Sequence, residues 1–140
     1  MAFVESLSEK IGRINRIKKR AEMIGEMRRN DTFAFKTILQ GFYDDRIVFE
    51  LPGPGAPPYT PSSLTDQENV LLHDARKLKY FVRALSPNLK QTKRENIFIE
   101  MLETVTPNDA AMLIAMKDKV SPWKNITKAI VNEAFPGLCG

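Results

Sequence analysis

The sequence has little of the residues that build metal and redox sites: one cysteine, one histidine and one tryptophan among 140 residues. Because Cys139 has no second cysteine in the chain, an intramolecular disulfide is excluded, and this usage fits a reducing cytoplasm. A zinc site needs clustered histidine, cysteine or carboxylate ligands, and His73 and Cys139 form no such cluster. The sequence therefore predicts no metal and no cofactor.

Long apolar runs are also missing. No segment approaches the roughly 20 apolar residues that a membrane-spanning helix needs. Residues 1–20 mix acids and bases and lack the apolar stretch of a secretory signal. We therefore expect a soluble protein with no membrane partner.

The nucleotide-binding and hydrolase motifs are absent as well. The chain contains no G-x-x-x-x-G-K-[ST] loop, no G-x-G-x-x-G after a strand and no G-x-S-x-G turn. The stretch from Gly53 to Gly55 is not a phosphate cradle, because Pro54 has no amide hydrogen to donate. We interpret His73 as a surface or boundary histidine rather than a general base. The sequence predicts a protein that is not an enzyme and has no small-molecule substrate.

What is present is ordinary globular composition, with 43% hydrophobic and 27% charged residues. This predicts a folded chain, and the length suits one domain over residues 1–140. The net charge of +4 tolerates a polyanionic partner but does not require one.

Apolar residues at helical spacing predict one long amphipathic helix from Phe3 to about Met27, within a basic segment 1–30. Arg13, Arg16 and Arg20 fall together on the side opposite the apolar stripe. The helix either packs on the rest of the domain or projects from it.

The next segments continue the helical pattern. Asn30 or Asp31 can cap a short helix whose buried residues are Phe35, Ile38, Leu39 and Phe42. The stretch "RIVFEL" lacks a partner strand, so we expect extended chain lying on the helices. Thr65 with Glu68 matches a capping box, which predicts a helix over 66–85 that buries Val70, Leu71, Ala75, Leu78, Phe81, Val82 and Leu85.

A hydroxyl residue followed by proline occurs three times in the C-terminal half, at Ser86, Thr106 and Ser121. Such a pair is typical of a helix start, because the hydroxyl accepts from a free amide and proline leaves none unpaired. These starts predict three further helices. The whole is expected to be all-α: a compact bundle of five or six helices with a proline-rich connecting loop.

That loop, "LPGPGAPPYTPSS" at 51–63, has two interpretations. It formally matches P-x-x-P, which aromatic grooves bind as an extended helix. The interpretation that we favour is a stiff linker anchored by Tyr59. The candidate partner-binding residues are Arg13, Arg16 and Arg20 of the first helix, Pro54, Pro57, Pro58 and Tyr59 of the linker, and Phe135 and Leu138 of the tail.

A second candidate surface is the basic run around "ARKLKYFVRA". Lysine and arginine contacts to phosphate supply most nonspecific affinity for nucleic acid. The residues that would make them are Lys77, Lys79, Arg83, Lys90, Lys93 and Arg94. The alternative is a solvated helix face, which the flanking acids Asp74 and Glu95 favour.

Several short motifs resemble an uncharacterised family of small proteins from T4-like tailed bacteriophages and their marine relatives. They are "PPY" at 57–59, "ARKL" at 75–78, "KDK" at 117–119, "AFPGL" at 134–138, and Arg94-Glu95 followed by Phe98-Ile99 and Leu102-Glu103. The resemblance covers roughly Asp31 to the end. It implies a viral protein made in the bacterial host cytoplasm or carried in the virion, and it supplies no catalytic residues.

The sequence thus leads to two functional hypotheses. The first is a non-enzymatic bacteriophage protein that contacts other phage or host proteins, as a virion structural or assembly component or as an adaptor. The alternative is a nucleic-acid-associated accessory factor in phage replication, recombination or transcription.

Overall fold

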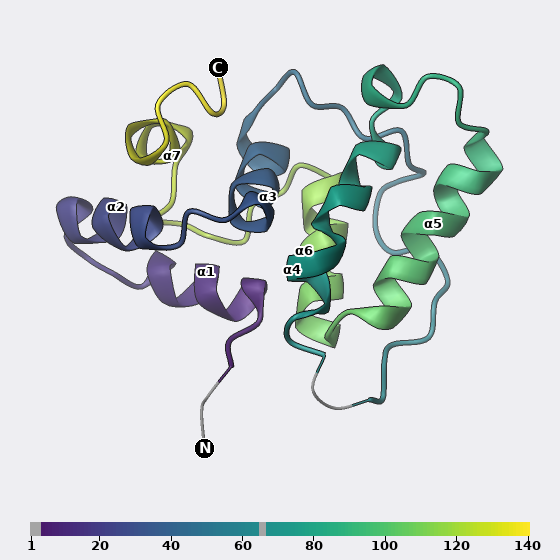
Figure 1. Ribbon diagram of the computed structural model, residues 1–140, viewed down its shortest axis with the longest axis horizontal. Helices are drawn as coiled ribbons and strands as arrows, with labels where there is room; N and C mark the ends of the chain where they lie inside the picture. The colour runs from purple at the N-terminus through teal and green to yellow at the C-terminus, as the bar shows by residue number, and fades with distance from the viewer. Residues whose placement is uncertain (1–3, 65–66) are drawn as a thin grey trace.

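The computed structural model describes residues 4–64 and 67–140, and over these residues the fold is all-α (Figure 1). The predicted all-α class is therefore confirmed, whereas the described residues form seven α-helices instead of the predicted five or six. The α-helices are α1 (Leu7–Asn15), α2 (Arg20–Arg29), α3 (Phe33–Tyr43), α4 (Val70–Asp74), α5 (Gln91–Thr104), α6 (Pro107–Lys117) and α7 (Lys128–Ala134). Two 3₁₀ helices, η1 (Ala75–Phe81) and η2 (Arg83–Leu85), follow α4. None of the described helices is long and apolar enough to cross a membrane.

The long N-terminal helix predicted from the periodicity is wrong, because the chain breaks between α1 and α2. Lys19 is extended, with φ −87° and ψ 126°. The break folds α2 back, so that Arg13 and Glu26 form an ion pair at 3.3 Å. In one straight helix these residues would lie about 20 Å apart along the axis. Both helices therefore bury apolar side chains in the core.

Helix α3 is close to its prediction. Its four predicted core residues are all buried, but the N-cap is Thr32, whose hydroxyl accepts a hydrogen bond from the Phe35 amide at 3.2 Å. The extended interpretation of "RIVFEL" also holds among the described residues. Phe49 makes an isolated antiparallel bridge with Val82, and the Glu50 amide donates to the Phe81 carbonyl at 2.8 Å.

The single helix predicted for 66–85 is wrong in extent. Regular α-helix covers only Val70–Asp74, and the chain then tightens into η1 and η2. Leu71, Ala75, Leu78, Phe81 and Val82 are buried as predicted, whereas Leu85 is 59% exposed. The predicted capping residue Thr65 lies outside the described residues.

Of the three predicted hydroxyl-proline starts, Thr106 alone begins a helix. Its hydroxyl accepts from the Asp109 amide at 3.0 Å, and Pro107 opens α6. Ser86 instead donates to the Val82 carbonyl at 3.0 Å and closes η2, so α5 starts later, at Gln91. Ser121 lies in a loop, where it shares a hydrogen bond of 2.8 Å with the Tyr43 hydroxyl, and α7 starts after Thr127.

The helices meet around one cluster of buried apolar residues to which every α-helix contributes. Helices α1, α2 and α7 lie on one side of α3, and α4, α5 and α6 lie on the other (Figure 1). Segments distant in sequence hold this arrangement: α1 packs on α6, and α2 packs on α7. Arg28 of α2 donates to the carbonyls of Glu133 and Ala134 at 2.9 and 3.2 Å.

Candidate functional site

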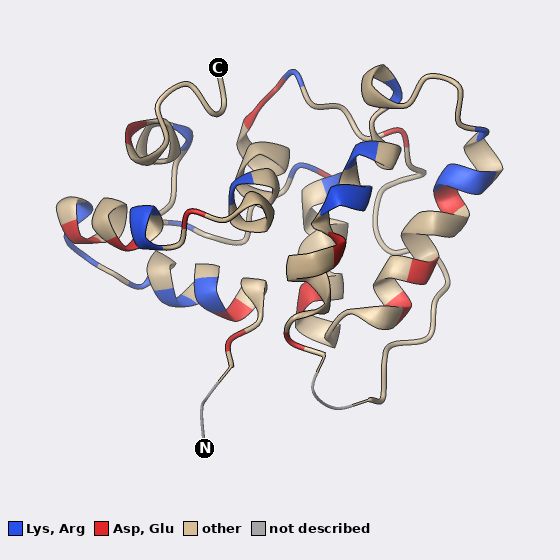
Figure 2. Cartoon of the chain, viewed as in Figure 1, with Lys and Arg blue, Asp and Glu red and all other residues tan. Residues whose placement is uncertain are grey.

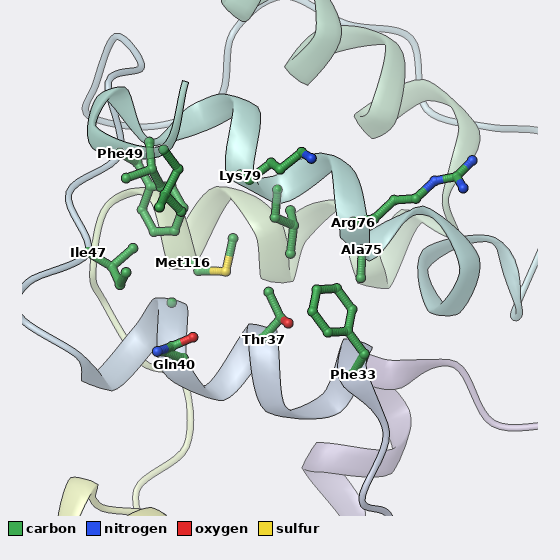
Figure 3. A pocket seen from close by; sticks show the side chains of 13 residues that line it. Phe33, Thr37, Gln40, Ile47, Phe49, Ala75, Arg76, Lys79 and Met116 are labelled. Atoms are coloured by element: carbon green, nitrogen blue, oxygen red, sulfur yellow. The ribbon is translucent and has the colours of Figure 1, made fainter. Parts of the chain in front are cut away.

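A cavity of about 210 Å³ opens between α3, the extended chain at 47–49 and η1 (Figure 3). This volume is below the roughly 300–1,000 Å³ of typical small-molecule sites. Helix α3 presents one stripe to the cavity, consisting of Phe33, Thr37, Gln40 and Gly41. The remaining wall is formed by Ile47, Phe49, Ala75, Arg76, Leu78, Lys79, Val82, Leu85 and Met116.

Gly41 allows α6 to contribute to the cavity wall. A Cβ atom at Gly41 would lie 2.5 Å from Met116 Sδ and 3.2 Å from Phe49 Cζ. The missing side chain therefore lets α3 approach Met116 and Phe49 closely. An isolated glycine within a helical pattern often has such a packing reason, so Gly41 is a signal that could have indicated a close approach here.

The rim of the cavity carries both exposed apolar and basic side chains. Phe33 is 65% exposed and Leu85 is 59% exposed, although both are large apolar side chains. Arg76 and Lys79 are exposed, and in Figure 3 both extend from η1 away from the cavity floor. No described lining residue is acidic. The chemistry available here is uptake of an apolar group with cations beside it.

The proline-rich segment is held down at several points rather than projecting. Lys117 Nζ donates to the Pro52 carbonyl at 3.1 Å, and Asp118 Oδ2 accepts from the Gly55 amide at 2.9 Å. Further along, Glu103 of α5 accepts from the Thr60 amide at 2.8 Å. Tyr59 packs on the core cluster, in agreement with its predicted role as an anchor. Pro54 and Pro58 remain exposed and Pro57 is half-buried.

Several motifs behind the sequence resemblance thus hold this segment or the core. Lys117 and Asp118 belong to "KDK", and the third residue, Lys119, hydrogen-bonds the Gly41 and Asp44 carbonyls at the end of α3. Glu103 is the last residue of the motif carried by α5. The contacts of these residues within the fold explain their presence in the motifs, and no ligand is needed for that explanation.

Among the residues predicted to bind nucleic acid, the prediction for Arg94 is wrong. It is 1% exposed, and its guanidinium donates to the carbonyls of Tyr80, Ser86 and Leu89 at 2.9 to 3.2 Å. Phosphate cannot reach a guanidinium that is buried and occupied by backbone carbonyls. The sequence pattern missed this because an arginine is usually exposed.

The other basic candidates remain on the surface. Lys77 pairs with Asp74 and Arg83 with Glu50, both at 3.6 Å, while Lys79 lies 5.5 Å from the centre of the Tyr80 ring. Lys90 and Lys93 are exposed at the start of α5. In Figure 2 basic positions gather on η1 and the first turns of α5, and acidic residues follow further along α5.

The N-terminal arginines do not form one cluster, because they lie on either side of the break. Arg13 pairs with Glu5 at 2.8 Å as well as with Glu26, and these hydrogen bonds raise its pKa. Arg20, on α2, pairs with Glu133 at 2.9 Å. Arg16 is exposed at the end of α1.

The tail residues also have internal partners. Phe135 is 9% exposed and packs edge-on against Phe35, with ring centres 6.1 Å apart, so it is a core residue rather than a free contact. Leu138 is half-buried, and its carbonyl accepts from Gln40 at 3.1 Å. Burial raises the pKa of the Cys139 thiol to about 11, which leaves it unreactive at neutral pH.

A family model described as "Family of unknown function (DUF6433)" matches residues 11–121. Comparison with curated proteins and with solved structures finds no match. Within the described residues, no group of histidine, cysteine and carboxylate side chains is arranged to hold a metal ion.

Proposed function

This chain belongs to the DUF6433 family of unknown function, and we propose that it acts without catalysis, by protein–protein contact through the cavity between α3 and η1. The observation that carries the proposal is the exposure of large apolar side chains beside an apolar hollow. Contiguous exposed apolar surface of this kind marks interaction sites more often than isolated apolar residues do. A partner side chain inserted there would cover Phe33 and Leu85 at once.

The motifs quoted above support a bacteriophage setting. We propose that the protein works in the host cytoplasm or in the virion, as a structural or assembly component or as an adaptor on a phage or host complex. In that role the helices form one compact bundle whose exterior is the working surface. The tethered segment 51–63 then belongs to the scaffold and is not the primary contact.

A photo-crosslinking experiment tests this proposal. Benzoylphenylalanine replaces Phe33 in the full chain, which is expressed in infected bacteria and irradiated. The same substitution at Leu64 is the matched control, because Leu64 is 72% exposed and apolar but does not line the cavity. We expect one dominant crosslinked protein from position 33 that is absent from position 64. Equal products at both positions, or none at either, would refute contact through this cavity.

Direct nucleic-acid binding is the second proposal, and its support is reduced. Arg94 is buried, and Lys77 and Arg83 are next to carboxylates. The residues left for phosphate contacts are Lys79, Lys90 and Lys93. A filter-binding titration at low salt tests this function separately. It compares the wild-type protein with a variant in which these three lysines are changed to glutamate, and the variant should retain less nucleic acid.

A further inference from the structure

The two cations beside the cavity have no acidic partner in the part of the chain that the structure describes, unlike Lys77 and Arg83 on the same pair of 3₁₀ helices. Within the described residues, neither Arg76 nor Lys79 forms an ion pair with a carboxylate. Asp74, the nearest acid along the chain, pairs with Lys77, and Glu50, whose amide bonds the Phe81 carbonyl at the end of η1, pairs with Arg83. The basic rim is therefore uncompensated.

The apolar and basic parts of the site form one continuous surface. Arg76 and Lys79 line the same cavity as Ala75 and Leu78, so a group held in the cavity lies beside both cations. On α3 the lining stripe runs from Phe33 to Gly41, which is about 12 Å of helix. That length and the cavity volume of about 210 Å³ suit one or two side chains of a short segment and not a whole domain face.

We infer that the occupant is an acidic segment of another protein, which inserts a bulky apolar side chain between α3 and η1 and places carboxylates on Arg76 and Lys79. This inference deepens the proposed function and rests on it. Charge complementarity selects the partner, because like charges across an interface are costly and opposite charges accelerate encounter. A second copy of this chain fits less well, since each copy carries a net charge of +4.

The inference is tested with a displayed library of random 12-residue peptides selected on the full-length protein. Enriched peptides are synthesised with a fluorophore, and their affinity is measured by anisotropy at two salt concentrations. We expect a bulky apolar residue within a few positions of at least two aspartates or glutamates. Binding should weaken as salt rises.

Three variants locate the binding. The double reversal R76E/K79E and the cavity-filling T37W should each weaken binding by about tenfold or more. F33E provides a second cavity variant that is safe for folding, because Phe33 is exposed and an acid suits the first turn of α3. The control K19E/K124E makes the same change in net charge at two exposed residues outside the cavity and should leave affinity within about twofold. Peptides with lysine in place of the acids should bind R76E/K79E better than wild type.

Several outcomes would overturn the inference. They are a library with no acidic preference, no enrichment above background, or binding that survives T37W and F33E. Concentration-dependent dimerisation lost in T37W would make a second copy the occupant and would equally overturn it. If the enriched peptides are apolar but not acidic and T37W abolishes their binding, contact through the cavity stands and only the acidic partner is refuted.

Discussion

Replacing Arg94 with methionine is expected to destabilise the protein far more than replacing any of the charged residues near it. Methionine keeps an unbranched apolar stem but removes the guanidinium that bonds three carbonyls and the Ser86 hydroxyl. These acceptors lie on η1 and on the chain that connects the 3₁₀ helices to α5, so the guanidinium ties both to α5. Their loss therefore loosens the whole connection.

The magnitude follows from counting those acceptors. A buried carbonyl left unpaired costs about 1–3 kcal/mol, so three would cost roughly 3–9 kcal/mol if no water reached them. Ser86 and Leu89 are half-buried, so water can replace part of the loss. Arg94 Nε also has no partner, which means that removing the buried charge gives some relief. We expect a net loss of about 2–4 kcal/mol, or roughly 10 °C in melting temperature.

Urea denaturation measures this loss. Trp123 is the single tryptophan, is 8% exposed and packs on Phe42, so its fluorescence reports unfolding. Arg83→Met is the control, because its side chain is 61% exposed and its ion pair is 3.6 Å long. That change should cost less than about 0.5 kcal/mol. If Arg94→Met is as mild as the control, the guanidinium does not hold this part of the chain and our account of Arg94 is wrong.

Two more variants probe the attachments of other segments. Asp109 is buried, and desolvation raises the pKa of its carboxyl group above the ordinary value of 3.8. The protonated carboxyl therefore favours the folded state. This contribution to the free energy of unfolding is complete below pH 3.8 and is lost as the pH rises through the pKa of the folded protein. Asp109→Asn should therefore gain stability relative to wild type as pH rises from about 3.5 to 7, in denaturant titrations that carry the exposed-site variant Asp45→Asn as the control. Asp118→Ala removes the acceptor for the Gly55 amide, so chymotrypsin should cleave after Tyr59 faster than in wild type or in Glu100→Ala, as read by mass spectrometry. Unchanged cleavage would show that this hydrogen bond does not hold the segment.

Local patterns predicted the parts of the fold that depend on local physics. Helical spacing placed Phe35 and Ile38 in the core, and the Thr106-Pro107 pair marked the start of α6. Both depend on contacts within a few residues. The predictions failed where contacts between distant residues determine where a helix ends. Periodicity runs unbroken through Ile17, but the ion pair of Arg13 with Glu26 requires the chain to turn.

The candidate site could not be predicted for the same reason. Its walls come from α3, the extended chain and η1, whose juxtaposition no single window of sequence shows. Phe33 lies off the buried stripe of α3, so helical spacing gives no reason to place it at a site. Arg94 shows the opposite error. It was predicted to be a surface residue that contacts phosphate, but it is buried and donates to four acceptors between Tyr80 and Leu89.

The pairing of α2 with α7 has a consequence for how the chain is made. These helices stand at opposite ends of the sequence, and the Ser8 amide likewise reaches its acceptor, Asp109, at 2.9 Å across most of the chain. Helix α2 therefore cannot be covered by its partner α7 until Lys128–Ala134 has been synthesised. We expect nascent chains that stop before Lys128 to expose Met23 and Met27 and to recruit holding chaperones, while released chains fold without them.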